Sequence, residues 1–170
     1  MYILLEKDRY THLIIGFGKA VVKIKERFFW LLMKDKLSTR NLLRRKNMAL
    51  DDYNCVICSL GTEETLLHLF LDCPFAVDCW TTLGLDIEDF TNPFQTITSF
   101  RNQLAIPFSM EVIISMCWDI WSVRNDANFR NIQPSIQNAR RHFRTDFAQV
   151  ILRAKKTYLP FISQWPDAYV

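Results

Sequence analysis

The chain has 170 residues, a hydrophobic fraction of 49% and a net charge of +3, with 13 Phe and 5 Trp. This composition excludes an intrinsically disordered chain, and the length allows one substantial core, alone or with a small metal-bound module. Only 4 Gly and 6 Pro are present, which favours helices over a sheet with many turns.

The charges are distributed in blocks along the sequence. Residues 19–50 hold ten Lys or Arg against two acids, whereas residues 51–90 hold nine acids and no Lys or Arg. Residues 134–170 are basic again, with six Lys or Arg against two acids. An acidic stretch between two basic ones indicates a polyanionic partner such as nucleic acid.

Neither a signal peptide nor a membrane span is predicted. The apolar run at residues 3–5 ends at charged residues, and no stretch approaches the roughly 18 apolar residues that cross a bilayer. The 5 cysteines are an odd number, which argues against a secreted disulfide scaffold. We therefore expect an intracellular protein, nuclear or cytoplasmic, whose thiols bind metal.

The first part of the chain is predicted to form a helical hairpin after a lead-in without a motif, residues 1–18. Apolar spacing predicts a helix over about 19–36 and a second, short helix over about 40–47, with Ser38 or Thr39 as its N-cap. The exposed side of this hairpin is basic. It is either an ordinary solvated surface or a surface that contacts phosphates.

Four candidate metal ligands follow in the pattern C-x2-C-x9-H-x4-C: Cys55, Cys58, His68 and Cys73. Thiolate and imidazole donors in this number suit a tetrahedral zinc ion, and no coordination position is left for a substrate water. The pattern therefore predicts one structural Zn2+. The alternatives are buried, unligated thiols with a core histidine, and Cys79 in place of Cys73 as the fourth ligand.

Two helices are expected around Cys73. Thr62 is predicted to cap the first, with the acids at 63–64 in its first turn facing the positive end of the helix dipole. Pro74 is predicted to begin the second helix, which ends near Gly84.

The rest of the chain is predicted to form a connector and two longer helices. Residues 86–109 are irregular, with at most one short helix. A strongly apolar helix is expected from 110 to about 130 with Ser109 as its N-cap, and a last one over about 135–158. The predicted fold class is mainly α, a helical hairpin and a small zinc knuckle packed on two longer C-terminal helices. The predicted segments are 1–18, 19–85, 86–109 and 110–170.

Short motifs occur in a recognisable order across residues 19–130. They are Phe29-Trp30-Leu31-Leu32, Leu37-Ser38-Thr39-Arg40-Asn41-Leu42, the C-x2-C pair, His68-Leu69-Phe70, Cys73-Pro74-Phe75-Ala76 and Trp80, and later Ile120-Trp121-Ser122-Val123-Arg124-Asn125. Residues 19–85 resemble the zinc-binding region of plant non-LTR (LINE-type) retroelement reverse transcriptases. The later motif resembles the segment that usually follows this region.

The resemblance implies a non-catalytic module that follows a polymerase domain and helps to hold nucleic acid. Its zinc ligands would be the four residues named above. The chain has neither the aromatic-x-Asp-Asp polymerase motif nor the four carboxylates of ribonuclease H, so it resembles a fragment of such a protein or a gene derived from one. His68 lacks the Glu that follows the His ligand in deaminases, and glycine-rich phosphate loops are absent. We expect no enzyme activity.

Three interpretations of the function follow. The first is RNA or DNA binding without sequence preference, through basic side chains on phosphates. The second is a protein-interaction or scaffold module that packs on neighbouring retroelement domains, and the third is a retroelement remnant without a present role. The candidate phosphate contacts are Arg40, Arg44, Arg45, Lys46, Arg140, Arg141 and Arg144, with Lys155 and Lys156.

Overall fold

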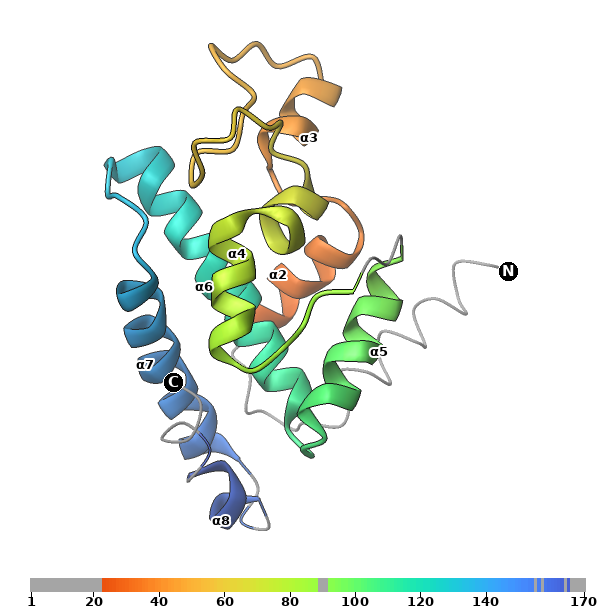
Figure 1. Cartoon of the computed structure of the whole chain (residues 1–170), viewed down its shortest axis with the longest axis vertical. Helices are drawn as coiled ribbons and strands as arrows, with labels where there is room; N and C mark the ends of the chain where they lie inside the picture. The colour runs from red at the N-terminus through yellow and green to blue at the C-terminus, as the bar shows by residue number, and fades with distance from the viewer. Residues whose placement is uncertain (1–22, 89–91, 155, 157, 164, 166–170) are drawn as a thin grey trace.

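The computed structural model describes residues 23–88, 92–154, 156, 158–163 and 165 (Figure 1). The predicted lead-in, residues 1–18, lies outside these ranges. Within them the chain is helical, with an isolated antiparallel bridge between Asn54 and Glu63. The mainly α fold class is therefore confirmed. The helices are α2 (Lys23–Met33), α3 (Arg40–Arg45), η1 (His68–Asp72), α4 (Pro74–Thr82), α5 (Pro93–Leu104), α6 (Ser109–Arg130), α7 (Ile136–Arg153) and α8 (Leu159–Ile162).

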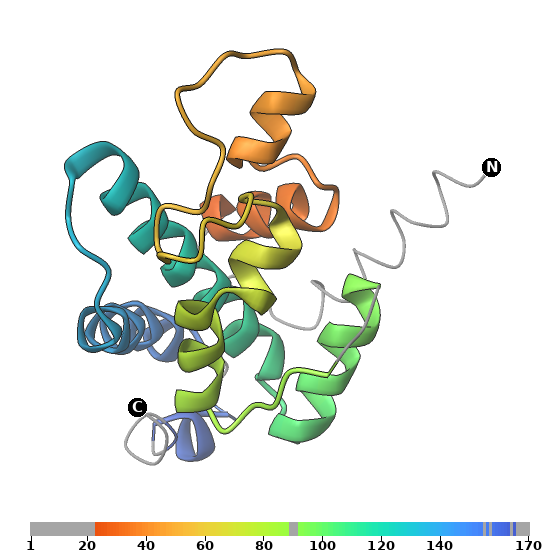
Figure 2. The same ribbon diagram turned by 45° about the horizontal axis from the view of Figure 1, so that its top comes forward.

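Helix α6 is the centre of the fold. It has 22 residues, and every residue from Ser109 to Cys117 is buried. It packs against α2, α4, α5, α7 and η1, which surround it in Figures 1 and 2. A helix with so many neighbours is expected to carry apolar side chains on more than one face, as the strongly apolar sequence of 110–130 predicts, although several polar side chains are buried with them.

Helix α7 packs on α6 through the apolar stripe that its sequence predicts. Ala139, Phe143, Phe147 and Val150 are buried and recur at intervals of three or four residues. The rings of Phe143 and Phe147 stack with centroids 5.5 Å apart. The helix ends at Arg153, earlier than the predicted boundary near 158.

Several predicted helix ends are confirmed. The Thr39 hydroxyl accepts a hydrogen bond from the Leu42 N–H at 3.2 Å at the start of α3, and the Ser135 hydroxyl accepts one from the Asn138 N–H at 3.4 Å at the start of α7. Helix α4 begins at Pro74, as expected. The prediction of Ser109 as an N-cap is wrong, because Ser109 is itself the first helical residue and is buried.

The predicted irregular connector contains a full helix, α5. Asn92 caps it by accepting a hydrogen bond from the Phe94 N–H at 2.9 Å, with Pro93 in the first turn. An Asn followed by Pro can end a preceding helix or begin a new one. Here Asn92 and Pro93 begin α5. Helix α5 buries Phe100, whose ring centroid lies 4.7 Å from that of Trp80.

Among the described residues, no single helix is long and apolar enough to cross a membrane. Helices α5 and α6 pass that test only as a pair, by length and composition alone, and the pair is bent by 120°.

A stripe of polar side chains is buried along α6. Glu111, Ser115 and Asp119 are each at most 1% exposed and follow one another at intervals of four residues. Each has a side-chain oxygen without a hydrogen-bond partner among the described residues. Burial raises the pKa of Glu111 and that of Asp119 to about 8, with the nearby Asp146 adding to the rise at Asp119. At neutral pH these two carboxyl groups are therefore largely protonated.

We expect the buried Glu111 to make folding stability fall as pH rises. An unfolded Glu ionises near pH 4.3, whereas folded Glu111 stays protonated until about pH 8, so the cost of burying the acid grows across this window and then levels off. Glu111→Gln removes this titration. The Tm of the variant minus that of the wild type should be larger at pH 8.5 than at pH 5. An equal difference at both values would contradict the prediction.

Candidate metal centre

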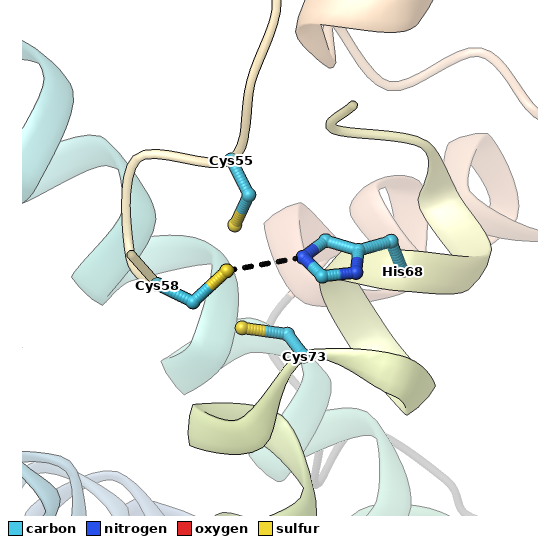
Figure 3. A group of neighbouring side chains, drawn as sticks. All are labelled: Cys55, Cys58, His68 and Cys73. Atoms are coloured by element: carbon cyan, nitrogen blue, oxygen red, sulfur yellow. Dashed lines mark hydrogen bonds between the residues drawn. The ribbon is translucent and has the colours of Figure 1, made fainter. Parts of the chain in front are cut away.

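The first two predicted ligands lie on a tight loop between α3 and η1. The Cys55 N–H donates to the Thr62 carbonyl at 2.8 Å, next to the bridge between Asn54 and Glu63, and this closes the loop. The chain turns back at Gly61, whose φ of 64° is in the region that favours glycine. The loop brings the sulfurs of Cys55 and Cys58 toward η1 (Figure 3).

The other two ligands flank the short π-helical segment η1. His68 is its first residue, and the Cys73 N–H donates to the His68 carbonyl at 2.6 Å. A π-turn of this kind is frequent at functional sites. The prediction that Thr62 caps this helix is wrong. Residues 62–64 pair with residues 53–55 around the bridge, and the Thr65 hydroxyl accepts the His68 N–H at 3.0 Å instead.

The four predicted donors converge on one point. The sulfur atoms and an imidazole nitrogen of Cys55, Cys58, His68 and Cys73 all lie within 4.8 Å of one another. The Cys58 sulfur is 3.3 Å from Nε2 of His68 (Figure 3). Three of the four side chains are buried, and Cys58 is half-buried. All four tetrahedral positions of a zinc ion would be filled by protein, which is typical of a structural site.

Cys79, the alternative fourth ligand, is outside this group. It lies on α4, is 2% exposed, and burial, helped by the nearby Asp119, raises the pKa of its thiol to about 12. A thiol in such surroundings acts as a small apolar side chain.

The protonation of the ligands suits metal binding. Burial lowers the pKa of His68, so that the imidazole is neutral at neutral pH, the form that binds metal. The hydrogen bond between Cys55 and Cys73 raises the pKa of Cys55, with burial adding to the rise, and lowers the pKa of Cys73. Both sulfurs bind zinc as thiolates, so a bound zinc would displace their protons.

A buried ion pair links α6 to the knuckle, which is the segment 53–73 that carries the four ligands. The side chains of Glu64 and Arg124 are 0% and 3% exposed, and Nη2 of Arg124 lies 2.7 Å from Oε1 of Glu64. Nε of Arg124 contacts both carboxylate oxygens, at 3.1 and 3.2 Å. The predicted role of Glu64 in a first helical turn is therefore wrong. Two features of the sequence could have indicated this ion pair. One is an arginine within an apolar helix, and the other is an acid close to the metal ligands.

The same pair also holds the start of α3. Oε1 of Glu64 accepts the backbone N–H of Arg40 at 2.9 Å, and the Glu64 carbonyl accepts the N–H of Asn41 at 3.1 Å. Arg124 donates to the Ser38 carbonyl at 3.4 Å. The knuckle, α3 and α6 therefore meet at one carboxylate.

The predicted phosphate contacts fall into two groups on different helices. Those on α3 differ in their surroundings: Arg40 is 19% exposed and donates to Asn54 and Asn128 at 3.0 Å, whereas Arg44 is 60% and Arg45 47% exposed. Helix α7 carries the second group. Helix α6 packs against α7, and its Asn128 accepts the hydrogen bond from Arg40 of α3. The exposed members are Arg44, Arg45, Lys46, Arg140, Arg141, Arg144 and Lys156, while Lys155 lies outside the described residues.

We expect purified protein to contain about one zinc ion per chain. His68→Ala removes one of four converging donors, so that the zinc content should fall to near zero. Cys79→Ala, a substitution at the alternative ligand, should keep the metal and serves as the control. Elemental analysis after exhaustive dialysis measures both. A folded wild type without metal, or loss of zinc in the Cys79 variant, would overturn the assignment.

Arg124→Ala should lower the free energy of unfolding by about 3–5 kcal/mol, because it leaves the Glu64 carboxylate buried and unpaired. The control is Arg130→Ala, which removes the exposed pair with Asp126 on the same helix and should have little effect. Chemical denaturation with excess zinc measures both variants. Equal unfolding midpoints for the two would contradict a structural role for the buried pair.

Comparison with known proteins agrees with the donor geometry. Residues 2–80 match the family model described as zinc-binding in reverse transcriptase, a range that begins before residue 19 and includes all four ligands. No curated protein and no solved structure matches the chain. The match supports a reverse transcriptase zinc-binding region, and together with the converging Cys and His side chains it identifies a centre for one structural zinc ion.

Proposed function

We propose that this chain is a non-catalytic zinc-binding module that helps a retroelement reverse transcriptase to hold RNA or DNA without reading its sequence. The observation that carries the proposal is the position of Arg44, Arg45 and Lys46. They follow one another at the end of α3, exposed to solvent, while Leu42 of the same helix is buried. Arginine and lysine side chains in such a row neutralise phosphates and favour any polyanionic backbone.

The zinc centre supports this surface by fixing its orientation. Zinc would close the loop that carries Cys55 and Cys58, and Glu64 in that segment holds the first N–H of α3. Toward the end of the helix, the Arg44 guanidinium lies over the Tyr53 ring, 5.5 Å from its centroid. A helix held at both places presents its cations with little loss of conformational entropy on binding.

The exposed ion pairs on α3 are compatible with phosphate binding. Arg44 lies 3.4 Å from Glu63 and Arg45 lies 2.6 Å from Asp35. Exposed pairs of this kind contribute only about 0–1 kcal/mol, so a phosphate can compete for the arginines. The arginines on α7 would extend the contact, and Arg40 would act mainly through its bonds within the fold.

The finer features implied by the sequence belong to this proposal. They are the plant, LINE-type origin, an intracellular location, and neighbouring retroelement domains as partners. The family that matches is a zinc-binding region and not the catalytic polymerase. The four protein ligands leave no coordination position for a substrate, which supports a module without enzyme activity.

A cavity favours a second candidate function, a protein-interaction module. About 430 Å3 of space lies between α2, η1, α5 and α6, with Phe29, Leu32, Phe70 and Ile97 among its mostly apolar walls. An apolar side chain from a neighbouring domain would fit such a site. This function and nucleic-acid binding use different surfaces and are compatible.

Affinity for RNA and DNA is expected to depend steeply on salt. Binding should fall by at least about tenfold between about 50 and 200 mM salt, and Arg44→Ala with Arg45→Ala should weaken it and reduce the slope by about two. Fluorescence anisotropy with an end-labelled oligonucleotide measures this.

The control is Arg101→Ala on α5, which removes an exposed arginine away from α3 and should leave the slope unchanged. An absence of binding even at low salt would refute nucleic-acid binding. Equal losses in the α3 and α5 variants would refute the assignment to α3.

A further inference from the structure

A hollow of about 460 Å3 lies beside the zinc module, between α3, residues 50–52 and the C-terminal half of α6. Its volume is within the range of about 300–1,000 Å3 that is usual for small-molecule sites. Its walls combine aromatic rings, amides and arginines: Trp121, Phe129, Asn125, Asn128, Arg40 and Arg124.

We propose that this hollow receives an unpaired base of a single-stranded nucleic acid. The inference rests on the proposed function and narrows it, from any polyanionic backbone to strands with accessible bases. It also assigns a role to residues of α6 that the basic surface of α3 does not use.

Of the two aromatic side chains, Phe129 has the exposed ring on which a base can stack, and Trp121 forms a rigid part of the wall. Phe129 is 75% exposed, among the highest exposures of the large apolar side chains described. Trp121 is half-buried, with the Arg124 guanidinium over its ring, 4.9 Å from the centroid, and the Phe28 ring 6.2 Å away. Because Glu64 fixes Arg124, the indole is held in place. Proteins that bind single strands stack bases on such rings, whatever the base.

The charges in the hollow favour a neutral base over a phosphate. Arg124 is neutralised by Glu64, and Arg40 lies 3.5 Å from Asp52. Asp51 and Asp52 both border the hollow and would repel a phosphate. The phosphates are therefore expected outside it, on the exposed cations of α3.

The amides supply hydrogen-bond donors that match a base edge. Oδ1 of Asn125 accepts from Arg124, and Oδ1 of Asn128 accepts from Arg40, both at 3.0 Å. With their oxygens used in this way, the NH2 groups are the parts of these amides that can face a ligand. Every base has carbonyl oxygens or ring nitrogens that accept hydrogen bonds.

The position of the hollow matches a strand that crosses α6. Leu43 lines it, and the exposed Arg44 is the next residue. On the other side, Trp121 and Asn125 also border a second hollow, about 520 Å3, that lies between α6 and α7 and includes Arg141. A strand with one base in the first hollow therefore has cations on both sides. In a duplex the bases are stacked and paired, so they cannot enter without opening.

The test compares Phe129→Ala with Leu152→Ala on α7, an apolar side chain of similar exposure, 79% against 75%. Anisotropy is measured at one salt concentration with a single-stranded oligonucleotide, its duplex and heparin, a polyanion without bases. Phe129→Ala should weaken single-strand binding by about 5- to 100-fold, since a stacked base contributes about 1–3 kcal/mol. It should leave heparin and duplex binding unchanged, and Leu152→Ala should change none of them.

The outcomes separate this inference from the proposed function. Loss of salt-dependent binding in the Arg44 and Arg45 variant, with no effect of Phe129→Ala, would overturn the base site and keep the proposed function. Equal weakening of heparin and single strands by Phe129→Ala would also overturn it. Binding of no nucleic acid at low salt would overturn both. Circular dichroism confirms that each variant is folded.

Discussion

The arrangement of the zinc module depends on the buried ion pair between Glu64 and Arg124. Removing two charges from water costs several kcal/mol each, and such a pair is tolerated only where hydrogen bonds satisfy its remaining atoms. Here the carboxylate accepts from the guanidinium at two nitrogens and from the first N–H of α3, and Arg124 also reaches the Ser38 carbonyl. Zinc would close the knuckle on itself, but none of its four candidate ligands lies on α3 or α6, so its effect on α3 would pass through Glu64. The ion pair fixes the knuckle to both.

The metal ligands and the hydrophobic core are also connected along the chain. The ligand Cys73 lies directly before α4, and Trp80 of that helix donates to the Phe70 carbonyl at 2.7 Å. Phe70 in turn belongs to η1, the segment between the last two ligands. Residues that bind metal and residues that fill the core therefore alternate along one short stretch. Loss of zinc should loosen this stretch first, while the packing of α7 on α6 has no ligand within it.

The parts of the structure that the sequence predicts are those encoded locally. Four thiol and imidazole donors at knuckle spacing, the cap Thr39, and the apolar stripe of α7 each lie within one short segment. Two of the errors come from pairings between separate segments of the chain. Thr62 and Glu64 look like a helix start until residues 53–55 pair with them, and an isolated sequence cannot show that pairing. The ion pair of Arg124 is also hidden from the sequence, because its partner Glu64 lies 60 residues away along the chain. Helix α5 differs, because we expect at most one short helix in 86–109 from the sequence, whereas the cap that begins a helix of 12 residues, Asn92, is encoded locally.

The same pairings change what the charge blocks mean for binding. Residues 19–50 have an excess of about eight positive charges, which alone would indicate a strong field for a polyanion. The structure pairs Lys25 with Asp146 and Arg40 with Asp52, and it places Glu63 and Asp35 beside Arg44 and Arg45. The positive field outside α3 is therefore weaker than the sequence implies. Salt weakens phosphate contacts from so few free cations further, because it screens exposed charges that are more than about 8–10 Å apart at physiological ionic strength. A module of this kind gains from a contact that salt does not weaken, and the proposed stacking of a base on the exposed Phe129 is such a contact.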